Sequence, residues 1–177
     1  LSVDSLSVLN KGIEIIKMET PQTTVVFGQK GVSRKNKDYF AARIINYILG
    51  GGGFQSRLYK EIREKKGLVY SVYSYLLPFE KTGIILGGFQ TRNKTVNETI
   101  GKVKDEWKKI KKNGISKQEL SNAKTYFKGS FSRNFTSTLS IANLLMIVQY
   151  YDLGENYFVN RDLIIDDIKL NDVNELA

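Results

Sequence analysis

No histidine and no cysteine occur among the 177 residues of this chain. Without cysteine the fold cannot be held by disulfides, a zinc ribbon or an iron–sulfur cluster, so it has to rest on a hydrophobic core. The length suits one domain with such a core, and a hydrophobic share of 41% is ordinary for a globular chain. Without histidine, the chain cannot contain a Ser-His-Asp triad or an imidazole metal site. Carboxylates alone could still hold a metal ion, but the acidic residues are scattered and form no D-x-D-x-D-G loop, so we predict no metal site in this chain.

The formal net charge of +9 is concentrated most densely in residues 102–112, KVKDEWKKIKK. Apolar residues recur in and before this run at steps of three and four, which is typical of one buried helix stripe. The stripe consists of Val96, Ile100, Val103, Trp107 and Ile110. The lysines fall on the opposite face together with Asp105 and Glu106, as on a solvent-exposed helix. We therefore predict no nucleic-acid partner, and a basic nucleic-acid binder stays only as a minor alternative.

No stretch of the sequence approaches the roughly 20 apolar residues that a membrane-spanning helix needs, so we predict no membrane partner. The chain begins at Leu1 rather than Met. It stops at Ala177, shortly after a D-V-N-E pattern at residues 172–175 that is typical of a helix start. We therefore expect a fragment of a longer protein. The absence of cysteine is compatible with either the bacterial cytoplasm or the periplasm.

Hydrophobic periodicity predicts short strands, then two helices, then a β-hairpin and four more helices. The predicted strands are residues 12–18, 23–28, 68–77 and 83–91, and the predicted helices are residues 39–49, 54–66, 95–112, 117–135, 138–151 and 157–168. This order predicts a single α+β domain over residues 1–177, with a largely antiparallel sheet and helices packed on one face. In the second helix, Phe54, Leu58 and Ile62 are expected to point inward. The helix at 138–151 is unusually apolar and is therefore expected to be central.

Four consecutive glycines, Gly50 to Gly53, follow the first predicted helix. They lack the G-K-[ST] ending of a phosphate-binding loop and the G-x-G-x-x-G spacing of a dinucleotide site. Their simplest interpretation is a helix end with an unrestricted backbone. A further glycine, Gly67, is well placed to end the second predicted helix.

The stretch LGGGGFQSRLYKEIREKKGLVYSVYSY, residues 49–75, resembles the non-zinc half of the pitrilysin, insulysin and mitochondrial processing peptidase family. The family pattern there is LGGG-x-x-SRL followed by RE-x-x-GL-x-Y-S. The matching positions are Leu49 to Gly52, Ser56, Arg57, Leu58, Arg63, Glu64, Gly67, Leu68, Tyr70 and Ser71. Three further segments resemble the family in order: Gln22 before a β-branched strand, G-I-S-K-Q-E-L at 114–120, and residues 169–174. The ordered set covers nearly the whole chain, so it is more specific than any one piece.

This resemblance implies a zinc peptidase built from two similar α+β halves that close around a peptide. One half carries the zinc motif H-x-x-E-H, and this chain cannot be that half because it has no histidine. It resembles the C-terminal partner half, which lends the site an arginine and a tyrosine seven residues apart. Arg63 and Tyr70 have that spacing. The implied partners are a peptide substrate and an H-x-x-E-H-bearing domain or subunit that holds the zinc.

Peptide hydrolysis places negative charge on the former carbonyl oxygen of a tetrahedral intermediate. The Tyr70 hydroxyl can donate a hydrogen bond to that oxygen, and the Arg63 guanidinium can hold a nearby substrate carbonyl. Without the motif, the same two residues are a helix-terminal charge and a packed strand tyrosine. Tyr73, Gly52 and Gly53 are further candidates for substrate binding. For Tyr73, packing within the sheet is the competing interpretation.

Arg57, in the same segment, is expected to form a structural ion pair rather than a substrate contact. Two functions follow from the resemblance. The first is the non-zinc half of a zinc metalloendopeptidase, inactive alone because zinc and general base lie on another domain or subunit. The alternative is a catalytically inactive scaffold or peptide-binding subunit of the same fold. A homo-oligomer formed through an exposed cleft face is also compatible with the sequence.

Overall fold

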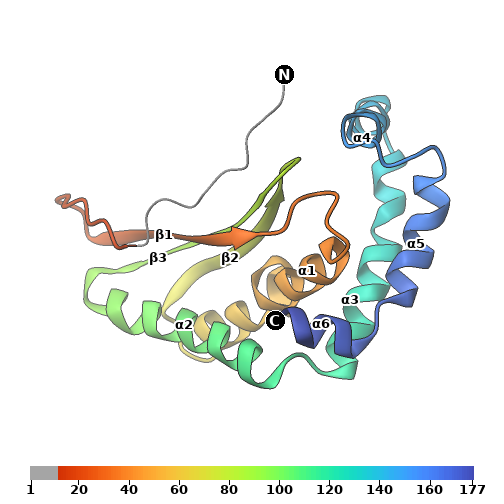
Figure 1. Ribbon diagram of the computed structural model, residues 1–177. Coiled ribbons are helices and arrows are strands. Elements are labelled where there is room, and N and C mark those ends of the chain that lie inside the picture. Colours follow the sequence, from red (N-terminus) through yellow and green to blue (C-terminus); the bar gives the residue numbers. More distant parts are fainter. Residues whose placement is uncertain (1–11) are drawn as a thin grey trace.

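The computed structural model of this protein describes residues 12–177 (Figure 1). Its strands are β1 (Gln22–Gly31), β2 (Val69–Pro78) and β3 (Gly83–Arg92). Its α-helices are α1 (Tyr39–Asn46), α2 (Val96–Asn113), α3 (Lys117–Gly129), α4 (Thr138–Tyr150), α5 (Tyr157–Asp167) and α6 (Leu170–Leu176). Two π-helical segments, η1 (Tyr47–Gly51) and η3 (Tyr59–Glu64), and three 3-10 segments, η2 (Gly53–Gln55), η4 (Asn93–Thr95) and η5 (Phe131–Phe135), complete the described elements. Leu1, where we expect the chain to have been cut, lies outside the described residues.

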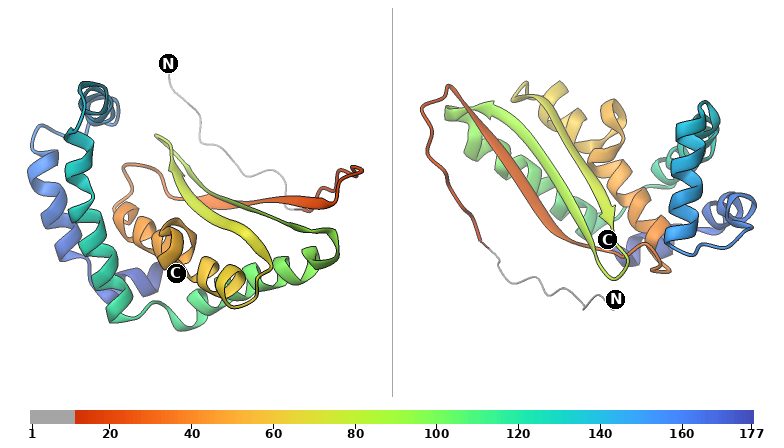
Figure 2. Two further views of the ribbon diagram at one scale, coloured as in Figure 1. Left: turned by 180° about the vertical axis from the view of Figure 1, so that it is seen from behind. Right: turned by 90° about the horizontal axis from the view of Figure 1, so that it is seen from above.

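The strands form one antiparallel sheet in the order β1-β3-β2, so β3 is central and β1 and β2 are the edges. β1 pairs with β3 from Gln22 opposite Arg92 to Gly31 opposite Gly83. Figures 1 and 2 show α1 and α2 lying against one face of this sheet, with α3, α5 and α6 grouped beyond α1. The predicted α+β fold, with an antiparallel sheet and helices on one face, is confirmed.

Two clusters of buried apolar side chains hold these layers together. The cluster between the sheet and its helices contains Leu49, Leu58, Ile62, Val69, Val72, Phe89, Val103 and Ile110. The cluster between α1 and the C-terminal helices contains Ala41, Ile44, Ile48, Ile115, Leu120, Ala123, Phe127, Ile165 and Val173. Ile45 of α1 packs against both clusters. The helix α1 therefore connects the sheet to the helices beyond it.

The basic helix α2 buries the predicted apolar stripe. Val103 and Ile110 are buried, and the ring of Trp107 meets Phe27 of β1 edge-on with centroids 5.4 Å apart. Glu106, expected on the solvent face, is instead buried. Its carboxylate lies 2.5 Å from the Lys109 ammonium, and this positive charge offsets the cost of removing the carboxylate from water.

The predicted strand at residues 12–18 is wrong. Residues 13–18 have no regular secondary structure and pair with no strand in the described part of the chain. Their large apolar side chains are 74–81% exposed: Ile13, Ile15, Ile16 and Met18. Alternating β-branched residues favour an extended backbone, but a strand also needs a neighbour to accept and donate its hydrogen bonds.

The expectation that helix 138–151 is central is also wrong. This helix, α4, buries no residue within the described chain and packs chiefly against η5. Leu139 and Tyr150 are 70% and 67% exposed. Figure 1 shows α4 at the tip of the helical group, away from the sheet. Its apolar residues lie all around the helix instead of forming one stripe. The sequence pattern therefore does not predict which face of the helix packs, or against what.

Two other boundaries differ from the prediction. The helix predicted over 117–135 is α3, which ends at Gly129, and residues 131–135 form the separate turn η5. The helix expected from residue 172 begins earlier, at Leu170, so Asp172 is inside its first turn. The Asp172 carboxylate accepts a hydrogen bond from the Lys169 N–H at 3.0 Å. Among residues 12–177, no helix is both long enough and apolar enough to cross a membrane.

Candidate functional site

A β-bulge near the start of β2 turns Tyr70 toward solvent. Val69 lies opposite Thr91, whereas Val72 lies opposite Phe89, so three steps along β2 match two steps along β3. The extra residue lets both valines point into the core although an odd number of steps separates them. Tyr70 is left on the surface, 85% exposed.

The turn before β2 brings the end of η3 next to the start of the strand. Gly67 has a positive φ of 60°, which confirms its predicted role as the residue that ends the helix. Its N–H donates to the Arg63 carbonyl at 2.9 Å, and the Leu68 N–H donates to the Ile62 carbonyl at 3.1 Å. This reversal makes neighbours of two side chains that are seven residues apart in sequence.

The structure brings Arg63 and Tyr70 together. The Arg63 guanidinium carbon lies 5.3 Å from the centroid of the Tyr70 ring, within the range of a cation–π contact. Arg63 is partly buried and Tyr70 is exposed. Among the described residues, neither the guanidinium nor the Tyr70 hydroxyl has a hydrogen-bond or ion-pair partner. Both groups therefore keep donors that can reach a ligand.

The glycine run brings helix and strand close together as well as ending the helix. The π-turn η1 continues through Gly51, so only Gly52 and Gly53 follow its end. A Cβ on Gly50 would lie 2.4 Å from the Ser74 Oγ and 2.7 Å from the Ser74 nitrogen of β2. Glycine is needed there because the helix backbone approaches the strand too closely for a side chain. Gly53 has a positive φ of 56° and open space around it.

Tyr73 lies apart from this pair. It is 47% exposed and stacks on Tyr75, with centroids 5.9 Å apart and rings nearly parallel. Ser74 between them is buried against Asn46, so the two tyrosines project from the opposite, uncovered face of β2. A Cβ on Gly88 would lie 3.2 Å from the Tyr73 hydroxyl, so this ring lies over Gly88 of the neighbouring strand.

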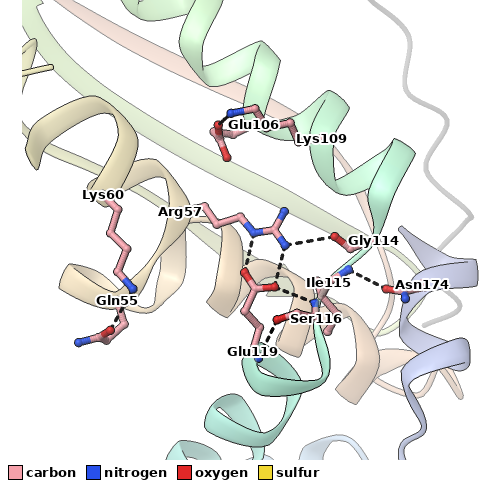
Figure 3. A network of polar contacts seen from close by, with 10 residues as sticks. All are labelled: Gln55, Arg57, Lys60, Glu106, Lys109, Gly114, Ile115, Ser116, Glu119 and Asn174. Atoms are coloured by element: carbon pink, nitrogen blue, oxygen red, sulfur yellow. Dashed lines mark hydrogen bonds and ion pairs between the residues drawn. The ribbon is translucent and has the colours of Figure 1, made fainter. Parts of the chain in front are cut away.

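Arg57 forms the structural ion pair that the sequence predicts (Figure 3). Its Nε and Nη2 both donate to the Glu119 carboxylate at 2.7 Å, and Nη2 also donates to the Gly114 carbonyl at 3.1 Å. Glu119 in turn accepts from the Ser116 N–H at 2.8 Å in a capping box at the start of α3. Asn174 of α6 accepts from the Ile115 N–H at 2.8 Å. The network thus ties the SRL segment to α3 and α6.

The ionisation of Glu119 reflects this network. Burial by itself would raise the pKa of the Glu119 carboxyl, but the Arg57 hydrogen bonds, the Ser116 N–H and the Arg57 charge lower it to about 2. The hydrogen bond to Glu119 likewise raises the pKa of Arg57 above its ordinary value. Arg57 therefore has a structural role, because Glu119 and the Gly114 carbonyl accept hydrogen bonds from its Nε and Nη2.

Sequence reasoning missed the aromatic residues around Arg63. Phe54, expected to point inward, is 68% exposed because residues 53–55 form a separate 3-10 turn, so the helical spacing from Phe54 to Leu58 does not apply. Tyr59 is buried beside it, with ring centroids 4.8 Å apart. A signal was present, since Tyr59 stands four residues before Arg63 and Phe54 nine residues before it, but periodicity placed Phe54 in the core and gave Tyr59 no role.

The residues of this chain do not suit a zinc ion. Among the described residues, no group of three or more Asp, Glu, His or Cys side chains converges. The sequence contains neither the imidazoles nor the thiolates that zinc sites use most often.

The sequence matches the protein family described as the peptidase M16 inactive domain, over residues 4–127. The chain belongs to this family. It is 36% identical over 131 residues to an uncharacterized zinc protease of Bacillus subtilis, YmxG, covering 70% of this chain and 30% of that protein. It is 31% identical over 170 residues to a Helicobacter pylori protein named non-peptidase homolog YmxG, covering 93% of this chain and 38% of that protein.

The same family is found by structure. The crystal structure of a peptidase M16 inactive domain from Pseudomonas fluorescens matches this chain with a TM-score of 0.82 and 33% sequence identity. The match covers 90% of this chain and 38% of that one. The chain thus spans about a third of the length of these relatives.

Proposed function

We propose that this M16 inactive domain is the non-zinc half of a zinc metallopeptidase and that residues 1–177 are one α+β domain of a longer, two-half protein. The observation that carries the proposal is the contact between Arg63 and Tyr70. The bulge in β2 and the turn at Gly67 present two unpaired donors side by side at one edge of the sheet. The family name and the zinc protease relatives support the peptidase class.

Each residue has a distinct role in the proposal. The exposed Tyr70 hydroxyl donates a hydrogen bond to the oxyanion that develops on the substrate carbonyl. The Arg63 guanidinium holds a neighbouring carbonyl of the peptide through its N–H groups. Zinc and the general base belong to an H-x-x-E-H-bearing half, because the donor set is missing here. Both roles require that half to close over the peptide.

Gly52, Gly53 and Tyr73 complete the proposed substrate-binding residues. Gly52 and Gly53 follow the π-turn η1 and directly precede Phe54, whose ring centroid is 6.0 Å from the Arg63 guanidinium carbon. A peptide held by Arg63 can pass over their side-chain-free backbone. Tyr73 offers an exposed aromatic surface on the uncovered face of β2, where a longer peptide or the partner half would meet it.

A specific observation favours the second candidate, an inactive scaffold or peptide-binding subunit. The Helicobacter pylori relative is named a non-peptidase homolog, and it aligns over 93% of this chain. In that case the Arg63–Tyr70 pair would bind or pack without catalysing. The two functions differ in whether hydrolysis depends on this chain.

Reconstitution separates the two functions. We expect the chain alone neither to bind zinc in equilibrium dialysis nor to cleave a fluorogenic peptide library. Adding the zinc-bearing half encoded with it should restore zinc-dependent cleavage. Cleavage by the zinc half alone at the same rate would contradict the catalytic proposal, and no cleavage by the combined, correctly associated halves would favour the scaffold.

A further inference from the structure

Three aromatic rings surround the guanidinium of Arg63. Its carbon lies 4.7 Å from the centroid of Tyr59, 5.3 Å from that of Tyr70 and 6.0 Å from that of Phe54. Phe54 meets Tyr59 edge-on, with planes at 86°. Phe54 comes from η2, Tyr59 and Arg63 come from η3, and Tyr70 comes from β2, so three elements build this group. We call Phe54 and Tyr59 the aromatic cradle.

Contact with ring faces leaves the in-plane N–H groups of a guanidinium free. A guanidinium carries five such donors, and a cation above a ring is attracted by the π-electrons without a hydrogen bond. Arg63 has no hydrogen-bond or ion-pair acceptor within residues 12–177. Arg57, on the same segment, shows the opposite arrangement, because Glu119 and Gly114 take its donors. The cradle therefore fixes the position of Arg63 without using its donors.

The buried hydroxyl of Tyr59 shows which part of this side chain matters. Tyr59 is 7% exposed, and its hydroxyl is a buried polar atom without a partner in the described part of the chain. Burying an unpaired hydroxyl is unfavourable, so the hydroxyl does not explain a tyrosine at this position. The ring face against Arg63 explains why an aromatic residue stands here.

We infer that Phe54 and Tyr59 are positioning residues that hold the Arg63 guanidinium beside Tyr70, with its N–H edges open for a peptide carbonyl. The inference rests on the proposed function, since it assigns a substrate contact to Arg63. Phe54 is on the surface, so its removal leaves the core intact. Without the cradle, Arg63 would sample many rotamers and lose its orientation.

The test compares variants of the full-length protein with its zinc-bearing half present. Phe54→Ala should lower kcat about two- to fivefold with little change in KM, since one exposed cation–π contact has that magnitude. Tyr59→Leu should lower kcat about tenfold, because the stronger of the two cradle contacts is lost. Tyr59→Phe keeps the ring and removes only the unpaired hydroxyl, so it should keep the parent kcat. Phe79→Ala, which truncates an exposed phenylalanine in the β2–β3 loop, is the matched control and should keep the parent rate.

A double-mutant comparison separates positioning from general stability. In the Arg63→Ala background, Phe54→Ala should have no further effect on kcat, whereas a purely structural role would lower the rate again. Equal kcat in the parent and in both Phe54→Ala and Tyr59→Leu, with Arg63→Ala still impaired, would overturn the cradle alone. Full activity of Arg63→Ala would overturn the proposed function.

A second readout tests the cradle without activity. With labelled arginine in the full-length protein, the Arg63 side-chain NMR signals should be shifted by the ring currents of its neighbours. The shift should shrink in Phe54→Ala and in Tyr59→Leu and persist in Tyr59→Phe. Unchanged Arg63 signals in Phe54→Ala and Tyr59→Leu would contradict the inference.

Discussion

Arg57 and Arg63 occupy one short segment of helix and turn, and their surroundings give them opposite properties. Arg57 donates both Nε and Nη2 to a carboxylate and further to a carbonyl, so its charge is neutralised and its position fixed. Arg63 touches aromatic faces and keeps its donors. Helical periodicity treats both arginines alike, as cations on the surface of the predicted helix. Only the resemblance to the peptidase family predicts different roles for them.

The Arg57–Glu119 pair makes the free energy of unfolding depend on pH. Because the folded pKa of Glu119 is about 2, below its ordinary value, its contribution is complete above about pH 5 and is lost as the pH falls toward 2. We expect Glu119→Gln to lower the free energy of unfolding by about 1.5–3 kcal/mol at pH 7. Urea unfolding at pH 7 and at pH 3 measures both effects.

The exposed pair Lys102–Asp105, 3.9 Å apart, is the control for this experiment. Asp105→Asn should change the free energy of unfolding by less than about 0.5 kcal/mol, because solvent screens surface ion pairs. If Glu119→Gln and Asp105→Asn unfolded at the same urea concentration at pH 7, the claim that the Arg57–Glu119 network stabilises the fold would be contradicted.

At the scale of elements, periodicity predicts α1, α2, α3 and the hairpin well because each of them buries one regular stripe or face. The bulge at Val69–Val72 is not predictable in this way, since it is a difference between two strands rather than a property of one. The strand predicted at 12–18 is wrong for a related reason. A strand needs a neighbouring strand, and the sequence of the segment itself does not say whether one is present. Tyr70 is exposed because of the bulge, so the site geometry needed the structure.

The close approach of η1 to β2 is open to a test with two glycines. Gly50→Ala should lower the free energy of unfolding by about 1–3 kcal/mol, because the new Cβ would lie 2.4 Å from Ser74 Oγ. Gly101→Ala, within α2 and with nothing within 4 Å of the new Cβ, should instead stabilise by about 0.5–1 kcal/mol. Thermal unfolding of the two variants should shift in opposite directions, and equal shifts would contradict the packing described for η1.

At the scale of the molecule, α4 is an apolar helix on the outside. We expect Leu145→Lys to change the free energy of unfolding by less than about 0.5 kcal/mol, because Leu145 is 52% exposed. Ile165→Ala, at a fully packed position of α5, should cost about 2–5 kcal/mol. Chemical unfolding of both variants gives the comparison, and a large loss in Leu145→Lys would mean that α4 is covered by another surface, such as a second copy of the chain.

The family and the half to which this chain corresponds could be predicted from the sequence. The absence of histidine and the ordered motif in residues 49–75 select the non-zinc half of a two-part family. The pair Arg63 and Tyr70 was predicted from that motif alone, while the cradle around Arg63 was not. Aromatic residues serve both cores and surfaces, so only their exposure and ring contacts separate the two uses.

The central claim is that this domain supplies Arg63 and Tyr70 to peptide hydrolysis carried out with a zinc-bearing half. The most direct measurement is kcat of the combined halves on one peptide for Tyr70→Phe and Arg63→Ala, with Tyr150→Phe on the exposed α4 as control. We expect kcat to fall by about 10²–10³ in the first two variants, with KM changed little, and to be unchanged in the control. Full activity in both Tyr70→Phe and Arg63→Ala would contradict the claim.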